Sequence, residues 1–250
     1  MKKIRVVFLG TNGWYATETG NTICTLISCP DYDIVLDAGS GIYKLDQYIN
    51  QQKPVYLFLS HFHLDHLEGL HILNKFKFKK GLYILGPKGA KEIFKTIICS
   101  PFTVPLKNLP FSSKIIELPL KKQRLPFQIK VLPMLHADLS LGCRLQLENK
   151  VIAYTSDTGY CQNAITLARK ADLLITECSF KSGQTNKAWP HLNPELAGKI
   201  AKKAQAKLLY LTHFAANLYK NLQQRKVSEK KARKIFKASF VCQDSLEVTM

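Results

Sequence analysis

The stretch SHFHLDHLEGL, residues 60–70, places three histidines and one aspartate within six positions, between an apolar run and a helix-like segment. The whole chain has 7 histidines in 250 residues. Chance would therefore produce the pattern H-x-H-x-D-H with a probability on the order of 10⁻⁴. A solvated polar loop is the alternative interpretation, and it gives no reason for this spacing. Imidazole and carboxylate groups at such density instead indicate metal binding.

Further histidines and aspartates stand where other predicted strands end. FQIKVLPML runs into His136, KVIAYTS runs into Asp157, and KLLYLT runs into His213. The carboxyl ends of strands are the usual place for binding sites in open sheets. Together with the first motif they supply five His and two Asp, which exceeds the need of one tetrahedral ion and is enough for two.

The spacing within the first motif allows two ions to be bound. In an extended turn His61 and His63 point the same way, so both can bind one ion, while Asp65 and His66 turn toward a second. Asp157 is the expected bridge, since a carboxylate joins two cations better than a neutral imidazole does. Two ions about 3.5–4 Å apart activate water and stabilise the attacking and leaving oxygens. We therefore expect two divalent metal ions as cofactors, Zn²⁺ first, with Mn²⁺ or Fe as alternatives.

The composition indicates an ordered globular chain of one domain, residues 1–250. Apolar residues make up 46% and charged residues 22%, and a chain of this length can bury a large core. No solenoid repeat or low-complexity linker interrupts it. The seven cysteines form no C-x-x-C pair, which argues against a disulfide framework and against a thiolate zinc site. No secretory segment or membrane helix is evident, so we expect a cytoplasmic protein without a membrane partner.

Short apolar runs, closed by Gly, Pro, Asp or Ser, predict many strands with helices between some of them. The expected strands cover residues 4–10, 22–28, 33–39, 54–60, 82–87, 114–120, 127–135, 143–148, 150–159, 172–180 and 207–214. The expected helices cover roughly 41–51, 66–76, 88–98, 161–170, 194–205 and 227–237. Strands first, then strand–helix alternation, indicate sheets covered by helices.

The residues HFHLDH at 61–66 resemble the H-x-H-x-D-H signature of the metallo-β-lactamase superfamily, and His136, Asp157 and His213 continue the match. The resemblance implies an α/β (α+β) fold class, the metallo-β-lactamase-like four-layer αββα sandwich, over residues 4–249. By the family pattern the first ion would be bound by His61, His63 and His136. The second would be bound by Asp65, His66 and His213, with Asp157 shared. Asp37, in VLDAGSG, resembles a family aspartate that orients a ligand histidine; the alternative is a turn aspartate that closes a strand.

Within the superfamily the chain is most similar to ribonuclease Z and related small phosphodiesterases. The stretches LYILGPKGAKEIF, ADLLITECSF and HLNPELAGKIAKKAQAKLLYLTHF carry this similarity. In ribonuclease Z a glutamate and a histidine act together near the leaving group, and here they correspond to Glu177 and His191. A carboxylate beside an imidazole favours the protonated ring, which can donate a proton to a departing alkoxide. The catalytic residues implied are Asp65, Glu177 and His191. The alternatives for the last two are a solvated strand-end carboxylate and a helix-start residue.

We therefore predict a binuclear metal-dependent hydrolase, a phosphodiesterase that acts on a cyclic or small phosphodiester. The alternative is a ribonuclease Z-like endoribonuclease for tRNA 3′ processing that lacks the usual Gly/Pro-rich arm, since residues 90–141 contain no glycine. Thr176 and Leu64 also stand where that enzyme usually has His and Gly. Two further hypotheses are ester, thioester or lactam hydrolysis, which gives Glu177 and His191 no evident role, and a basic nucleic-acid-binding protein with a structural metal.

The chain is strongly basic, with 36 Lys and Arg against 18 Asp and Glu, a net charge of +18. Such an excess attracts anionic partners, so the expected partner is a phosphodiester substrate, either a small cyclic phosphate or RNA. Three basic stretches could contact a nucleic-acid backbone: KFKFKK (75–80), LKKQR (120–124) and RKVSEKKARKIFK (225–237). A half-buried strand with guarding lysines and an amphipathic helix explain the first and last equally well. Because homologues often form dimers, a homodimer is a further expectation.

Overall fold

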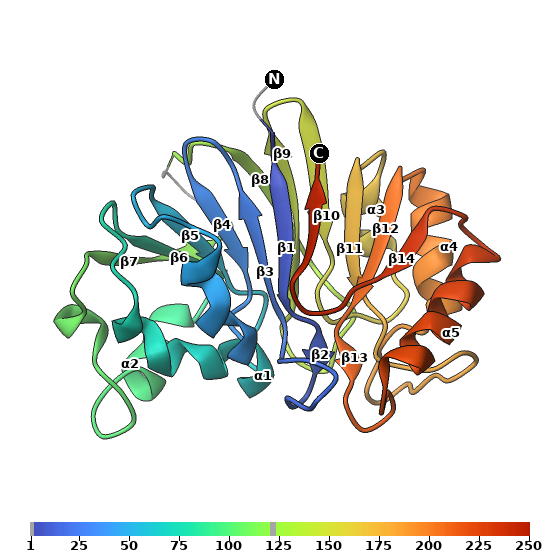
Figure 1. The fold of residues 1–250 in the computed structure, drawn as a ribbon, viewed down its shortest axis with the longest axis horizontal. Helices are drawn as coiled ribbons and strands as arrows, with labels where there is room; N and C mark the ends of the chain where they lie inside the picture. Colours follow the sequence, from blue (N-terminus) through green and yellow to red (C-terminus); the bar gives the residue numbers. More distant parts are fainter. Residues whose placement is uncertain (1–2, 121–123) are drawn as a thin grey trace. The chain divides into compact units, whose positions relative to one another are not determined.

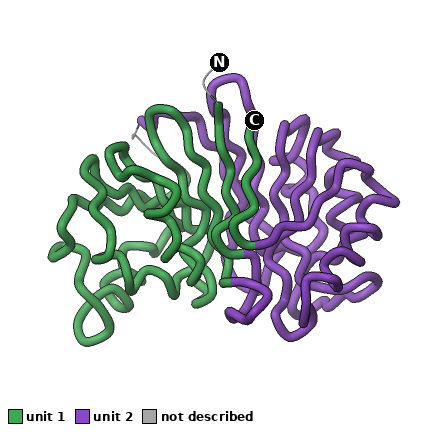
Figure 2. The backbone as a smooth tube through the Cα atoms, in the orientation of Figure 1, with its two compact units in different colours: residues 1–10, 21–121, 244–250 green, residues 11–20, 122–243 purple. Residues whose placement is uncertain are grey.

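The computed structural model describes residues 3–120 and 124–250, and the chain divides into two compact units (Figure 1). Unit 1 comprises residues 1–10, 21–121 and 244–250, and unit 2 comprises residues 11–20 and 122–243 (Figure 2). Each unit contains one mixed sheet, its own helices and its own apolar core. A single domain over residues 1–250 stays a prediction. Most of the basic stretch LKKQR, residues 121–123, lies outside the described part.

Unit 1 is built on a seven-stranded sheet with the order β15-β1-β3-β4-β5-β6-β7. Its strands are β1 (Arg5–Gly10), β3 (Cys24–Ser28), β4 (Asp33–Leu36), β5 (Val55–Phe58), β6 (Leu82–Pro87), β7 (Ser113–Leu118) and β15 (Leu246–Thr249). Strands β4 to β7 run parallel, whereas β15, β1, β3 and β4 pair antiparallel. Its helical segments are η1 (Ser40–Gln47), α1 (Leu64–Leu67), η2 (Glu68–Lys75), α2 (Ala90–Ile97) and η3 (Leu106–Asn108). Buried side chains such as Leu57, Leu45 and Phe94 join the sheet to these helices in one core.

Unit 2 is built on a six-stranded sheet with the order β14-β12-β11-β10-β9-β8 and a small pair, β13-β2. Its strands are β2 (Asn12–Gly13), β8 (Gln128–Pro133), β9 (Leu141–Leu147), β10 (Lys150–Tyr154), β11 (Leu173–Glu177), β12 (Leu208–Thr212), β13 (Phe214–Ala215) and β14 (Ser239–Val241). Its helices are α3 (Gln162–Ala168), α4 (Pro194–Ala204) and α5 (Leu222–Arg233). The strands β10, β11, β12 and β14 are parallel, so their carboxyl ends lie on one edge of this sheet.

Helix α4 begins where the sequence predicts it, and helix α5 begins earlier. The Asn193 side chain caps α4 by accepting a hydrogen bond from the Leu196 N–H at 2.9 Å. Asn221 caps α5 in the same way through the Gln224 N–H at 3.0 Å. The first turn of α5 is mostly polar and shows no apolar periodicity. The apolar pattern alone therefore predicts a start at residue 227. Among the described residues, no helix has the length and apolar character that crossing a bilayer requires.

The stretch KFKFKK keeps its predicted alternation without forming a strand. Phe76 and Phe78 are buried and their rings stack at 5.1 Å between centroids, whereas Lys77 is exposed. The backbone N–H groups of Lys77 and Lys79 donate to the side chain and the carbonyl of Gln51, not to a neighbouring strand. The preceding segment was predicted as one helix over 66–76 and is instead a short α1 followed by the 3-10 helix η2.

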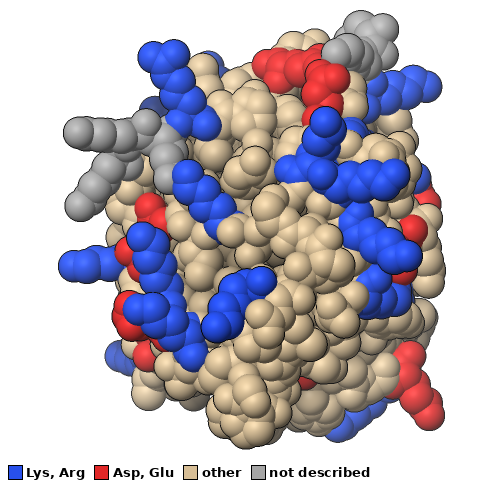
Figure 3. Space-filling model, turned by 90° about the vertical axis from the view of Figure 1, so that its left-hand side faces the viewer, with Lys and Arg blue, Asp and Glu red and all other residues tan. Residues whose placement is uncertain are grey.

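The basic residues are spread over the surface, as Figure 3 shows for one face, where acidic groups are fewer. On helix α5, Lys226 and Lys230 are exposed and Ala232 is buried, which is the amphipathic pattern. Arg225 departs from the expected basic surface because it is only 1% exposed. At least one of the positive charges counted in the net charge of +18, that of Arg225, is therefore buried and not on the surface.

The reactivity of the cysteine thiols tests the packing of the apolar cores of the two units, which contain Cys24 and Cys178. Cys24 and Cys178 are 0% exposed, and burial raises the pKa of both thiols well above its ordinary value. Since only the thiolate reacts, iodoacetamide should label the half-buried Cys99 and Cys161 in the folded protein and spare Cys24 and Cys178. Peptide mass spectrometry measures the labelling, and the denatured chain, with all seven cysteines modified, is the control. Labelling of Cys24 as fast as Cys99 would contradict the packing described above.

Candidate metal centre

In unit 1 the HFHLDH motif follows β5 and folds back on itself. The His61 ring centroid lies 4.5 Å from that of His63 and 4.1 Å from that of His66. The Nε2 atom of His66 lies 3.8 Å from the Asp65 Oδ2 atom. His61 and His66 are 0% exposed. The loop and the first turn of α1 therefore bring all four predicted ligands of this motif together.

The rings of His66 and His61 are each held by a hydrogen bond at Nδ1. His66 Nδ1 donates to Asp37 Oδ2 at 2.9 Å, and His61 Nδ1 donates to Ser60 Oγ at 2.9 Å. Ser60 Oγ in turn donates to Asp37 Oδ2 at 2.8 Å, and the Ser60 N–H donates to Oδ1 at 2.7 Å. With Nδ1 engaged, Nε2 is the nitrogen of each ring that can bind a metal ion.

Asp37 reaches His66 because its backbone turns sharply after β4. Its φ of 56° is in the left-handed region, which few residues other than glycine adopt and which Asp tolerates better than most. The turn lets one buried carboxylate serve Ser60 and His66 at the same time. The orienting role of Asp37 stays a prediction, and the direct contact is the geometry that this role requires.

In unit 2 Asp157 follows β10 and lies close to two histidines that follow other strands, His136 after β8 and His213 after β12. The His213 Nε2 atom lies 3.3 Å from Asp157 Oδ1, and the His136 Nε2 atom lies 4.0 Å from Asp157 Oδ2. The side chains of His136, Asp157 and His213 are 0%, 3% and 7% exposed. A buried carboxylate with one imidazole near each oxygen is the arrangement that a bridging ligand needs.

His213 is fixed from two sides. Its Nδ1 donates to Ser179 Oγ at 2.9 Å, and Ser179 Oγ donates to the His213 carbonyl at 3.0 Å. The backbone of Gly13 packs on the ring, and a Cβ at Gly13 would lie 2.4 Å from His213 Cε1. Only glycine permits this approach, so β2 pairs with β13 directly beside the ring.

Arg225 holds the loop that carries Gly13. Its guanidinium donates to Thr11 Oγ1 at 2.8 Å, to the Cys242 carbonyl at 3.2 Å and to Asn12 Oδ1. The Arg225 Cζ atom also lies 4.7 Å from the centroid of the Phe214 ring, a cation–π distance. This buried arginine therefore ties helix α5 to both strands of the β13-β2 pair.

Glu177 and His191 form a buried pair in unit 2. His191 Nδ1 donates to Glu177 Oε1 at 2.7 Å. The remaining acceptor positions of Glu177 are taken by the backbone N–H groups of Thr158, Ser179 and Leu192 at 2.7, 3.1 and 3.2 Å. The His191 ring centroid lies 5.6 Å from that of His136 and 6.1 Å from that of His213. Glu177 is thus buried and fully bonded, and His191 lies beside two predicted ligands.

The sequence did not single out Ser60, Ser179 or Arg225. Ser60 directly precedes His61 and Ser179 comes two residues after Glu177, so adjacency to candidate site residues was the available signal. Arg225 has no local signal, because its partner Thr11 is 214 positions away in the sequence. His71, the exposed histidine of η2, donates a hydrogen bond from Nδ1 to the Glu68 carbonyl and belongs to neither group of candidate ligands among the described residues.

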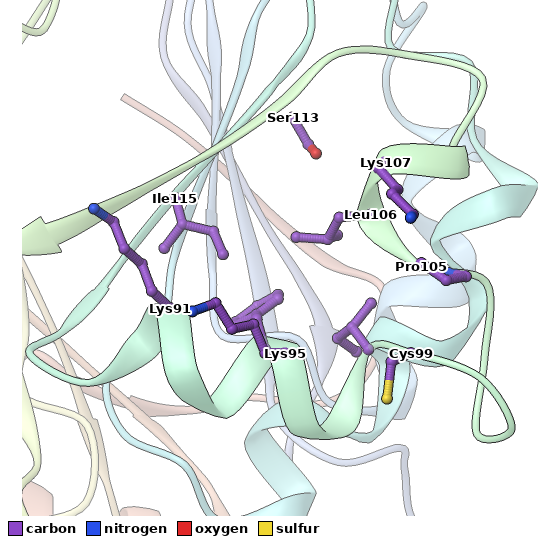
Figure 4. Close-up of a pocket in the computed structure, with 10 residues that line it drawn as sticks. Lys91, Lys95, Cys99, Pro105, Leu106, Lys107, Ser113 and Ile115 are labelled. Carbon is purple, nitrogen blue, oxygen red and sulfur yellow. The ribbon is translucent and has the colours of Figure 1, made fainter.

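Unit 1 also has a cavity of about 560 Å³ between α2, η3 and β7 (Figure 4). Lys91 and Lys95 of α2 and Lys107 of η3 border it, and Leu106 and Ile115 add apolar surface. Its lining contains no predicted ligand or catalytic residue among the described residues. The cavity is therefore distinct from the histidine cluster of unit 1.

The candidate ligands, all His and Asp, are side chains of the types that bind divalent metal ions. Both units present buried or half-buried imidazole and carboxylate groups, of the kind and number typical of a binuclear centre. No cysteine is included in these groups, which matches the N and O ligand preference of Zn²⁺ and Mn²⁺ sites that keep positions open for water.

Comparison with known proteins places these observations in a family. The model of the Beta-lactamase superfamily domain matches residues 32–214. The "Probable metallo-hydrolase YhfI" of Bacillus subtilis is 30% identical over 219 residues, which cover 84% of this chain and 86% of that protein. The "Ribonuclease Z" of Pyrococcus abyssi is 27% identical over 268 residues, with the same coverage of 84% and 86%.

Two solved structures have a fold similar to that of this chain. The crystal structure of YhfI superposes with a TM-score of 0.82 at 25% identity and covers 100% of both chains. Human tRNase Z, short form, superposes with a TM-score of 0.76 at 21% identity and covers 98% of both chains. These matches confirm the predicted fold class, an α/β metallo-β-lactamase fold with two mixed sheets.

The substitution Asp37→Asn tests the orientation of His66. The amide can donate to the ring where the carboxylate accepts, so we expect the metal affinity of the purified protein to fall 10- to 100-fold. Competition with a chromogenic chelator measures this affinity. Asp46→Asn is the matched control, because Asp46 pairs with Lys75 on the surface of the same unit. Equal affinities for both variants and the unmodified protein would contradict the orienting role.

Proposed function

Because the chain belongs to the metallo-β-lactamase superfamily, in the branch that includes ribonuclease Z and YhfI, we propose that it is a binuclear phosphodiesterase. Its proposed substrate is a cyclic or small phosphodiester. The observation that carries this proposal is the pair of Glu177 and His191, joined at 2.7 Å. Cleaving a phosphodiester with an alkoxide leaving group requires a proton for the departing oxygen, and the proposed donor of that proton is His191, which lies beside the predicted ligand His136.

The proposed ligands of the first ion are His61, His63 and His136. Those of the second ion are Asp65, His66 and His213, with Asp157 shared by both. Two divalent ions, when bound, supply an activated water and neutralise charge on the phosphate. Zn²⁺ is the first candidate, with Mn²⁺ or Fe as alternatives. The hydrogen bonds at Nδ1 of His61, His66 and His213 support this assignment, because they leave Nε2 as the ligand atom.

Glu177 and His191 would deliver the proton to the leaving group. Glu177 is held by three backbone N–H groups, so it positions His191 without moving itself. Its hydrogen bond occupies His191 Nδ1, and Nε2 is then the atom that gives its proton to the departing alkoxide. Asp65 is proposed to accept the proton of the attacking water, since its side chain is 12% exposed beside the buried His66.

A ribonuclease Z-like endoribonuclease is the second candidate. Relatives named ribonuclease Z and the +18 charge favour it. The chain lacks glycine over residues 90–141, where the arm of that enzyme would be expected, and this supports the smaller substrate.

A comparison of leaving groups tests the role of His191. An alkoxide needs a proton to depart and p-nitrophenolate does not. We therefore expect His191→Ala to lower kcat on 2′,3′-cyclic AMP by about 10²- to 10⁴-fold and on bis-p-nitrophenyl phosphate by far less. Steady-state kinetics with Zn²⁺ or Mn²⁺ gives both values. His71→Ala is the matched control, since His71 is an exposed histidine.

Asp157→Ala provides the stricter test of the centre. Removing the proposed bridge should abolish turnover of both substrates and reduce the bound metal below two ions per chain, as measured by elemental analysis. Full activity in this variant would refute a metal-dependent mechanism at this site.

A precursor tRNA with a 3′ trailer separates the two candidates. The phosphodiesterase proposal expects much higher kcat/KM on 2′,3′-cyclic AMP than on the precursor, each measured with and without chelator. Efficient removal of the trailer at the discriminator position would instead establish the endoribonuclease.

A further inference from the structure

We infer that Trp189 is a stacking platform for an aromatic base, so that the preferred phosphodiester carries a nucleobase. This inference rests on the proposed phosphodiesterase function and deepens it, because it names the substrate class. Trp189 was not among the residues that the sequence singled out.

Trp189 combines exposure with closeness to the histidines of unit 2. The residue is 46% exposed. Its ring centroid lies 5.8 Å from that of His136 and 6.4 Å from that of His191. The ring planes meet at 62° and 58°, which are edge and tilted contacts and not the parallel arrangement of a stacked base. A large aromatic surface therefore borders both a predicted ligand and the predicted proton donor.

The loop that carries Trp189 is held in place by its own hydrogen bonds. Asn186 Oδ1 accepts from the N–H groups of Ala188 and Trp189 at 2.9 and 3.1 Å. The Asn193 side chain, which also caps α4, donates to the Gln184 carbonyl at 2.9 Å. A platform with a fixed backbone loses less conformational entropy on binding than a mobile one.

A second exposed apolar group, Leu135, directly precedes His136 in the chain. Leu135 is 50% exposed, and its side chain would lie 3.0 Å from a Cβ at Gly159, as would the Cβ of Pro190. Gly159 therefore lets Leu135 pack close to the segment that bears Trp189. Exposed apolar surface beside a phosphate site is suited to a ligand that joins an anion to a flat apolar ring, which describes a nucleotide.

Two p-nitrophenyl esters test the inference, because they share a leaving group and differ in the base. Thymidine 5′-(p-nitrophenyl phosphate) carries a nucleobase and methyl p-nitrophenyl phosphate does not. Loss of one stacked base should raise KM by about 5- to 150-fold. We expect this increase for the thymidine ester in Trp189→Ala, with kcat little changed, and no increase for the methyl ester. Trp189→Phe should restore most of the affinity, since phenylalanine keeps a π-face.

Phe102→Ala is the control for a general effect of losing an exposed aromatic ring, because Phe102 is 72% exposed in unit 1 and is not among the proposed site residues. Its KM values should equal those of the unmodified protein. An equal change of KM for both esters in Trp189→Ala, or no change for either, would overturn the inference.

Fluorescence provides a readout that does not depend on turnover. In Trp14→Phe, Trp189 is the single tryptophan, so AMP should quench the emission saturably and ribose 5-phosphate should not. The absence of quenching by AMP would overturn stacking. If neither ester is hydrolysed with Zn²⁺ or Mn²⁺, the proposed function fails, while saturable quenching by AMP alone would still support a base-binding platform at Trp189.

Discussion

A histidine presents a defined nitrogen to a metal ion or a substrate only when its other nitrogen is fixed, and this constraint accounts for the hydrogen bonds around the candidate histidines within each unit. Asp37 fixes His66, Ser60 fixes His61, Ser179 fixes His213, and Glu177 fixes His191. Each partner is buried, so solvent does not compete for these hydrogen bonds. The polar partners are in turn held by backbone groups, as Glu177 is by three N–H donors.

The backbone meets this constraint at the carboxyl ends of parallel strands. Asp37 follows β4 and His213 follows β12, with φ values of 56° and 51°. Left-handed backbone is less favourable than the α or β region even for Asp and His, which tolerate it better than most residues, and it persists where the surrounding structure determines it. At His213 this support comes from Ser179, from the close approach of Gly13 and, through the strand pair, from Arg225. Local strain at the site is therefore balanced by contacts that extend through unit 2.

The segment between β11 and α4 joins chemistry to substrate preference. It begins directly after Glu177 and includes Trp189 and His191, so the proposed proton donor and the proposed base platform are two residues apart. Asn193 closes the segment by capping α4 and by bonding to the Gln184 carbonyl. A change in the length or anchoring of this segment would alter proton delivery and substrate contact together.

The sequence by itself determined the local features: most strands, the cap of α4 at Asn193, and the histidine and aspartate residues at the strand ends. These follow from short-range apolar periodicity, side-chain capping and a motif within six positions, all of which act between near neighbours. Only the tertiary structure decided that Arg225 is interior, that Gly13 packs on His213, and that Ser179 fixes the same ring. The physical reason is separation along the chain. Arg225 and Thr11 are 214 positions apart, and Ser179 and His213 are 34 apart, so only folding brings the donor and the acceptor together.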